Sequence, residues 1–180
     1  LRGDLPKVFS GNLDSSYAAE LVSDIKEEGG FCTGGACYPE GHPESATLFS
    51  DIENLKRKVD AGCDFLTTQM FFDNDVFYNF LSKVREAGIY VPVIAGIMPV
   101  TNAKQIKRII GLSGGSLPTR FRRIVERFGD NDVAMLQAGI VYASEQIIDL
   151  YANGVRGVHV YSMNKPQVAE AIKANLSSII

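Results

Sequence analysis

The sequence predicts an α/β fold built on a parallel β-sheet. Strand-like and helix-like segments alternate along the 180 residues, and strict alternation is typical of parallel strands joined by helical crossovers. The strand-like segments are mostly apolar, as expected when both faces of a sheet are covered. No Gly-x-Gly-x-x-Gly motif follows a strand, so the dinucleotide-binding fingerprint is absent. A doubly wound sheet and an eight-stranded β/α barrel both fit this pattern.

Four segments have the apolar character of buried strands. They are FCTGGAC (31–37), FLTTQMFF (65–72), VPVIAGIMPV (91–100) and GVHVYSM (157–163). Pro92 lies at the start of the third segment, where a missing backbone donor is tolerated. His159 lies inside the fourth, and we expect it to be a core histidine whose hydrogen bonds are satisfied rather than a functional group.

The remaining segments have the apolar spacing of helices, with recognisable ends. Asp14 is a candidate N-cap for a helix that Gly29 and Gly30 end. Asp73 caps a helix that stops at Gly88. Further helices are expected at 47–61, 102–112, 117–128 and 131–153, and the last runs from Pro166, which suits a first helical turn, to about Leu176.

Composition limits the class of function. The 18 Lys and Arg against 21 Asp and Glu give a net charge of −3, which offers no reason to expect nucleic acid or an anionic membrane as partner. No apolar run is long enough to span a bilayer and no secretory signal is visible, so we expect a cytoplasmic protein with a single domain, 1–180. The three cysteines lack paired metal-site spacing, which indicates structural thiols in a reducing compartment and no metal.

Polar side chains gather at the predicted carboxyl ends of the strands, most densely in GGACYPEGHPES (34–45). Chemistry in β/α folds gathers at these ends. The opening segment and the four strand ends supply Arg2, Asp4, Tyr38, Glu40, His42, Thr68, Gln69, Asp73, Thr101, Asn102, Gln105, Tyr161, Asn164 and Lys165. The pattern therefore predicts one polar rim.

Each of these groups also has a structural interpretation. Asp73 and Asn102 are expected to be helix caps before ligands, and Tyr161 can pack its ring and satisfy its hydroxyl locally. Gln69 is different, because an amide in an apolar strand is costly to bury unless its donors and acceptors are met. For Gln69, and for His42 between two prolines, the structural and functional interpretations stay equally open.

The run NLKRKVDAG (54–62) has two interpretations as well. Its charges are most simply a solvated helix face. Asp51, Asn54 and Lys58, however, share one face at helical spacing, with Arg57 beside them. Such a cationic cluster below a polar loop could hold a phosphate or pyrophosphate.

Six ordered motifs together resemble the methylenetetrahydrofolate reductase family. They are LRGDLP, YPEGHPES, NLKRKVDAG, TTQMFFD, GIMPVTN followed by KQ, and VYSMNKP, and the match runs nearly from end to end. The resemblance implies a (β/α)8 TIM barrel that binds FAD. It also implies that hydride passes from NAD(P)H to the flavin and then to 5,10-methylenetetrahydrofolate, giving 5-methyltetrahydrofolate.

The resemblance also assigns residues to the site. Flavin contacts would be made by Arg2, Gly3, Asp4, Ala18, Tyr38, His42, Ser45, Asp51, Asn54, Arg57 and Lys58. Folate would meet Asp4, Gln69, Gln105 and Lys165. Asp4 would tune flavin reduction, and Gln69 would bond the pterin or, in turn, the nicotinamide, so that two substrates share one face in ping-pong kinetics. Bacterial members usually have arginine where this chain has Lys165, which keeps the charge without the bidentate fork.

By this alignment the chain would cover the C-terminal half of the barrel, from the end of strand 4 to helix 8. The family's proton-donating glutamate, at the end of the first strand, would lie in a longer polypeptide or another chain, and the 180 residues alone are expected to be inactive. A homo-oligomer is expected. The alternatives are a non-catalytic flavin- or folate-binding module and a different barrel enzyme, such as a lyase or aldolase. No lysine lies mid-strand as a Schiff-base nucleophile would, which disfavours the last.

Overall fold

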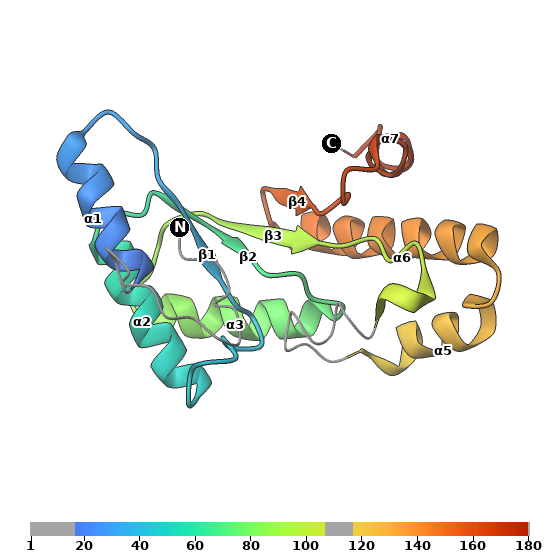
Figure 1. Cartoon of the computed structure of the whole chain (residues 1–180), viewed down its shortest axis with the longest axis horizontal. Helices are drawn as coiled ribbons and strands as arrows, with labels where there is room; N and C mark the ends of the chain where they lie inside the picture. The colour runs from blue at the N-terminus through green and yellow to red at the C-terminus, as the bar shows by residue number, and fades with distance from the viewer. Residues whose placement is uncertain (1–16, 107–116, 180) are drawn as a thin grey trace, which may run out of the picture.

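The computed structural model describes residues 17–106 and 117–179, and Figure 1 shows its ribbon. Within these ranges, parallel strands form one sheet in chain order, β1-β2-β3-β4. The strands are β1 (Gly34–Cys37), β2 (Phe65–Thr68), β3 (Val93–Ile97) and β4 (Val158–Val160). Each lies inside a segment expected to be a strand, so the α/β fold with a parallel sheet is confirmed.

Helices connect the strands and largely follow the predicted bounds. They are α1 (Ala18–Glu28), α2 (Leu48–Asp60), α3 (Asn74–Glu86), the 3-10 helix η1 (Ala103–Gln105), α5 (Thr119–Phe128), α6 (Asp132–Ala152) and α7 (Pro166–Asn175). The expected cap Asp73 accepts a hydrogen bond from the Asp75 N–H at 3.0 Å, and Asn131 accepts from two N–H groups at the start of α6. Pro166 occupies the first turn of α7, as expected.

Two predicted helices differ from the structure at their bounds. Asp14 lies outside the described residues, and α1 begins at Ala18 after Tyr17 in extended backbone, so the predicted cap is wrong. In the segment expected to be helical over 102–112, the structure describes η1 and Ile106, and the remainder lies outside the described residues. Asn102 does cap η1, accepting from the Lys104 N–H at 2.8 Å.

One face of the sheet packs against helices. Strand residues on this face join two apolar clusters with α2, α3, α6 and α7, and they are Cys37, Leu66, Val93, Ala95, Ile97, Val158 and Val160. The alternate residues, on the opposite face, are Gly34, Ala36, Phe65, Thr67, Ile94, Gly96 and His159. A doubly wound sheet has helices on both faces and a reversal of strand order. Among the described residues the helices cover one face and the strands follow in chain order, which is instead the connectivity of a β/α barrel; closure into a barrel stays a prediction.

His159 is exposed, so the expectation of a core histidine is wrong. Its neighbours Val158 and Val160 face the helices, and the two-residue repeat of a strand therefore turns His159 to the opposite face. There its ring meets Tyr161 edge-on, with ring centroids 4.6 Å apart.

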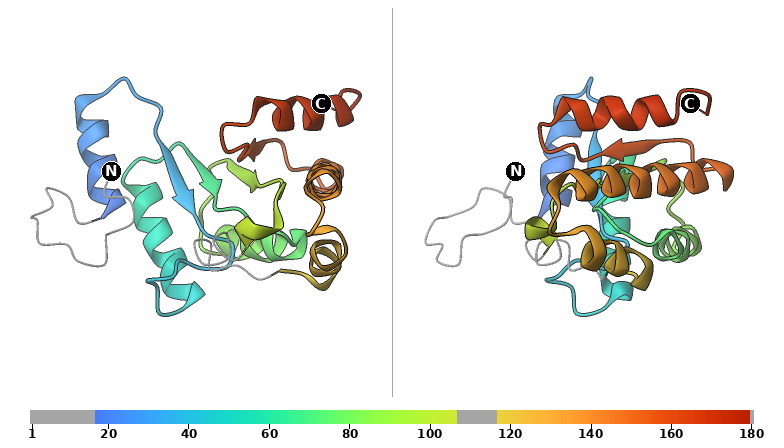
Figure 2. Two further views of the ribbon diagram at one scale, coloured as in Figure 1. Left: turned by 45° about the vertical axis from the view of Figure 1, so that its right-hand side comes forward. Right: turned by 90° about the vertical axis from the view of Figure 1, so that its right-hand side faces the viewer.

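Between β3 and β4 the chain adds a pair of packed helices, α5 and α6, which Figure 2 shows side by side. A third apolar cluster lies here, and includes Phe121, Met135 and Tyr142. Among the helices of the described residues, none has both the length and the apolar character needed to cross a bilayer.

The buried Tyr142 makes the stability of this region sensitive to alkaline pH. Its hydroxyl donates to the Phe72 carbonyl at 2.6 Å, and burial raises the pKa of Tyr142 to about 12. Folding thus favours the neutral phenol, so this stabilisation is complete below pH 10 and is lost as pH rises from about 10 to 12. A pKa raised from 10.0 to about 12 corresponds to about 2.7 kcal/mol, which solvent screening lowers to about 2 kcal/mol.

We therefore expect Tyr142→Phe to flatten the fall in the free energy of unfolding over that interval, measured by urea denaturation at a series of pH values. At pH 7 the variant should lose about 1 kcal/mol for the missing hydrogen bond. An alkaline fall of the wild-type size in Tyr142→Phe would contradict this assignment.

Candidate functional site

The carboxyl ends of the four strands meet at one edge of the sheet, because the strands are parallel and adjacent. The segment after β1 holds residues 38–47, Gln69 follows β2, the segment after β3 leads to Thr101, and Tyr161 to Lys165 follow β4. These segments contain the polar groups that the sequence placed at strand ends. The shared rim thus follows from the observed topology.

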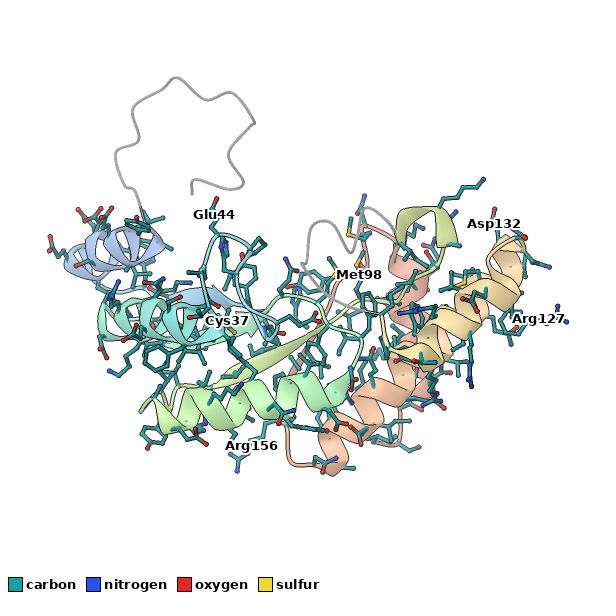
Figure 3. All side chains as sticks on the ribbon, turned by 90° about the horizontal axis from the view of Figure 1, so that it is seen from below. Cys37, Glu44, Met98, Arg127, Asp132 and Arg156 are labelled. Atoms are coloured by element: carbon teal, nitrogen blue, oxygen red, sulfur yellow. The ribbon has the colours of Figure 1, made fainter. Side chains whose placement is uncertain are left out.

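The loop after β1 is folded against α2. Gly41 N–H donates to the Tyr38 carbonyl at 3.0 Å and Ser45 N–H to that of His42 at 2.9 Å, forming two successive turns. The carboxylate of Asp51, in the first turn of α2, accepts from the His42 N–H at 3.2 Å and from Ser45 Oγ at 2.9 Å. The rings of Tyr38 and His42 meet edge-on at 4.6 Å. Figure 3 shows Cys37 at the base of this loop and Glu44 at its outer end.

Asp51 ties this loop to α2 through two hydrogen bonds. Asp51→Ala removes both acceptors, so we expect faster amide hydrogen exchange across 38–45 and a loss of about 1–2 kcal/mol in the free energy of unfolding. Ser50→Ala, in the same helical turn, serves as a control: its hydroxyl bonds the backbone of Thr47 at the start of α2 but makes no hydrogen bond to residues 38–45. Unchanged exchange in Asp51→Ala would show that the loop is held by something else.

Two cations lie on α2, the helix that holds this loop through Asp51. Lys58 Nζ donates to the Ala36 carbonyl at 2.7 Å, and the exposed Arg57 donates to Asn54 Oδ1 at 2.8 Å. Burial raises the pKa of Cys37 to about 12, an effect that the charge of Lys58 opposes and that of Asp51 reinforces. The structure therefore brings Asp51 and Lys58 close to the end of β1, with a neutral thiol beneath them.

The cysteines form no site of their own. Cys37 and Cys63 are buried free thiols, and Cys32 is exposed, which agrees with structural thiols for the first two. In the parts of the chain that the structure describes, no group of three His, Cys, Asp or Glu side chains could hold a metal ion.

Gln69 lies half-buried just past β2. Its backbone N–H donates to the Cys37 carbonyl at 2.7 Å, and its side-chain Oε1 accepts from the Met70 N–H at 3.0 Å. Among the described residues, the Gln69 Nε2 amide has no hydrogen-bond partner. The described residues therefore meet only part of the hydrogen-bonding demand of this side chain and leave the two hydrogens of its amide as donors.

Lys165 reaches across the rim from β4 to the segment after β3. Its Nζ donates to Thr101 Oγ1 at 3.0 Å, and its backbone N–H donates to the Ser162 carbonyl at 3.0 Å. The two residues inside this turn, Met163 and Asn164, both have left-handed backbone, with φ of 51° and 58°. That conformation is unfavourable for methionine, so a tight and costly turn presents Lys165 at the rim.

Tyr161 makes a contact that its sequence position did not reveal. Its hydroxyl donates to the Thr68 carbonyl at 2.8 Å, linking the segments after β4 and β2. Burial raises the pKa of Tyr161, with smaller contributions from Cys37 and Tyr38, so the phenol remains a donor. The 93 positions between the two partners explain why no local pattern signals the bond.

Some predicted site residues cannot be placed in this arrangement. Arg2, Gly3 and Asp4 lie outside the described residues. Gln105 ends η1, and its side chain is likewise not described. Ala18 is the first, exposed residue of α1, which packs against α2. The structure therefore brings together Tyr38, His42, Ser45 and Asp51 directly, with Lys58 beside them and Gln69 hydrogen-bonded to β1.

Comparison with known proteins identifies relatives of this chain. The chain matches the family model for methylenetetrahydrofolate reductase over residues 1–177. It is 36% identical to the 5,10-methylenetetrahydrofolate reductase of Escherichia coli K12, a match that covers 96% of this chain and 57% of that protein. It is 34% identical to methylenetetrahydrofolate reductase (NADH) 1 of Arabidopsis thaliana, covering 99% of this chain and 33% of that one. The chain thus spans between a third and somewhat over half the length of these relatives.

Among solved structures, the fold is similar to that of an uncharacterized protein from Clostridium thermocellum. The TM-score is 0.60 at 19% sequence identity, over 87% of this chain and 57% of that one. That protein is described as binding two copies of 5-methyl-5,6,7,8-tetrahydrofolic acid. At this level of identity the likeness supports the fold alone. The family match and the identity to curated reductases together show that this chain belongs to the methylenetetrahydrofolate reductase family.

Proposed function

We propose that this chain carries flavin- and folate-binding residues of an enzyme that reduces 5,10-methylenetetrahydrofolate to 5-methyltetrahydrofolate with NAD(P)H. One observation carries the proposal. The loop 38–45 is held by Asp51 of α2, the helix that also carries the cations Arg57 and Lys58. The same loop follows β1, which pairs with β2, the strand that Gln69 follows. The membership of the family supplies the reaction, and this arrangement supplies the groups that would serve it.

The donor set fits FAD. A pyrophosphate needs cations and N–H donors, and Lys58 has two ammonium hydrogens left after its bond to Ala36. The Arg57 guanidinium is exposed and uses one of its five donors on Asn54. Tyr38 and His42 offer ring surfaces, and Ser45 a hydroxyl. With Arg2, Gly3, Asp4, Ala18, Asp51 and Asn54, these residues would hold the cofactor, which when bound supplies hydride acceptance and donation.

Folate recognition would fall to the other strand ends. The two Nε2 hydrogens of Gln69 match the carbonyl and ring-nitrogen acceptors of a pterin edge. Lys165 would meet the glutamate carboxylate of the folate as a point charge, and Gln105 and Asp4 would complete the contacts. Because Lys165 is a single ammonium already bonded to Thr101, it should bind the carboxylate more weakly than a bidentate arginine would.

The proposed reaction uses one face for two substrates in turn. Gln69 would hydrogen-bond the nicotinamide amide while NAD(P)H is bound and the pterin while folate is bound, so occupancy must alternate. Ping-pong kinetics follow, with parallel lines in double-reciprocal plots.

The deciding experiment is the absorbance spectrum of the protein produced from its complete coding sequence, before and after anaerobic addition of NADH. Flavin bands that bleach with NADH and return with 5,10-methylenetetrahydrofolate would support the reductase. Flavin bands that NADH and NADPH both leave unchanged would indicate a partner protein as electron donor or a non-catalytic binding module. A protein that purifies without flavin and takes up none when flavin is added would contradict the assignment of residues 38–58 to flavin binding.

A further inference from the structure

The β2–β3 ladder changes its hydrogen bonding at Thr68. The paired positions are Leu66 with Val93 and Thr67 with Ile94, and the pairing stops there. The Gly96 N–H then donates to the side chain of Thr68, at 2.8 Å from Oγ1. The hydroxyl of Thr68 thus takes the place that a strand carbonyl would hold. The Thr68 carbonyl is left for another donor in a residue with no exposed surface.

Tyr161 is that donor, and Gly96 makes its approach possible. A Cβ at position 96 would lie 2.8 Å from Tyr161 Cε2 and 2.3 Å from the Thr68 carbonyl oxygen. The ring of Tyr161 therefore lies against β3 at the one position where no side chain intervenes. From there its hydroxyl reaches the Thr68 carbonyl at 2.8 Å.

The consequence falls on Gln69, because the Thr68 carbonyl and the Gln69 N–H belong to one planar peptide unit. Tyr161 holds the oxygen of this unit, and the Cys37 carbonyl holds its N–H at 2.7 Å. Both polar atoms of this peptide are thus held by hydrogen bonds, one to Tyr161 and the other to Cys37. A plane fixed at both ends sets the direction in which the Gln69 side chain leaves the backbone.

We propose that Tyr161 is a positioning residue for Gln69, aiming its Nε2 amide at the substrate through the Thr68–Gln69 peptide; this rests on the proposed function. Tyr161 need not touch substrate in this role. Its removal leaves a buried carbonyl without a donor and lets the peptide plane rotate. A hydrogen-bonding amide that is misdirected by about 1 Å loses much of its effect on a bound substrate.

The test compares Tyr161→Phe, Gln69→Ala and the double variant in the protein produced from its complete coding sequence. We expect Tyr161→Phe to lower kcat/KM for 5,10-methylenetetrahydrofolate about 10- to 100-fold, chiefly through KM, and to leave flavin content unchanged. In the Gln69→Ala background, Tyr161→Phe should lower kcat/KM less than about twofold, because the amide that Tyr161 positions is absent. Rates are taken at 10 °C and normalised to the folded fraction measured by circular dichroism, so a loss of stability does not count as a loss of activity.

Tyr142→Phe is the matched control. It removes the same kind of bond, from a buried tyrosine hydroxyl to the carbonyl of Phe72, three residues beyond Gln69. We expect it to change kcat/KM less than about threefold, since this bond does not involve the Gln69 peptide.

The outcomes separate the two proposals. Equal losses from Tyr161→Phe in the presence and absence of Gln69 would overturn the positioning role and leave the proposed function standing. Wild-type kcat/KM in Tyr161→Phe would overturn it as well. Wild-type activity in Gln69→Ala would overturn both the folate contact of Gln69 and the role of Tyr161, whereas a protein with no reductase activity in any form would overturn the proposed function itself.

Discussion

Gly139→Ala should lower the free energy of unfolding by about 3 kcal/mol, at the upper end of the cost of overpacking a core. A Cβ at this position would lie 1.9 Å from the carbonyl oxygen of Val100 and 2.7 Å from its carbonyl carbon. Both are backbone atoms, which cannot rotate out of the way as a side chain does. Helix α6 would have to move away from the segment after β3, opening the cluster around Met135 and Tyr142.

The size of this effect is informative because helix propensity acts in the other direction. Alanine within a helix is favoured over glycine by about 1 kcal/mol, so the steric cost must exceed that gain. Gly157→Ala is the control: it adds the same methyl group, and the nearest atom would be 4.0 Å away. It should change stability by less than about 0.5 kcal/mol, or raise it slightly.

Urea denaturation of both variants, followed by circular dichroism, measures the difference. Equal stabilities for Gly139→Ala and Gly157→Ala would mean that α6 does not approach Val100 as closely as described. Gly139→Ala also tests the rim indirectly. A shift of Val100 would move the next residue, Thr101, which accepts the hydrogen bond from Lys165.

The second large effect follows from the proposed function and is expected on the affinity for FAD. Replacing Arg57 and Lys58 together with glutamine should weaken FAD binding about 100-fold or more, because each charge-assisted hydrogen bond contributes about 1.5–3 kcal/mol. The free energy of unfolding should change by less than about 1 kcal/mol, because Arg57 is exposed and Lys58 bonds a single carbonyl. Fluorescence titration of the apoprotein with FAD gives the affinity.

Lys56→Gln is the matched control for this pair. Lys56 lies on the same helix, next to Arg57, but its ammonium pairs with Asp60. The substitution Lys56→Gln removes one positive charge and leaves the proposed pyrophosphate contacts in place, so FAD affinity should fall less than about threefold. The wild-type affinity should also weaken with added salt, and the Arg57, Lys58 double variant should lose most of that dependence. A double variant that binds FAD as the wild type does would remove these cations from the site.

The sequence predicted the parts of this fold that depend on local rules. The caps Asp73 and Asn102 and the first-turn Pro166 lie where the sequence predicted them, because a helix start is set by backbone groups within a few residues. The strands follow from short apolar runs between helices. His159 was misassigned, because period alone does not say which face of a strand the helices cover.

The site was predictable only in part, and the reason is distance along the chain. The tie of Asp51 to His42 spans nine positions and lies within one strand–loop–helix unit. The contacts of Tyr161 with Thr68 and of Lys165 with Thr101 span 93 and 64 positions. Such pairs depend on which strands are neighbours, and no local pattern contains that information. The placement of residues at strand ends was inferable, while their partners across the rim were not.

The sequential order of the strands has a consequence for how the chain folds. β1 pairs with β2, and β2 with β3, at separations of about 30 residues, as in Gly34 with Phe65 and Leu66 with Val93. The pairing of β3 with β4 joins Ala95 to Val158 and encloses both α5 and α6. Since the entropy of loop closure and the wait for the intervening helices both grow with that span, β4 should dock last. The segment that carries Tyr161 and Lys165 would then be the final part of the rim to assemble.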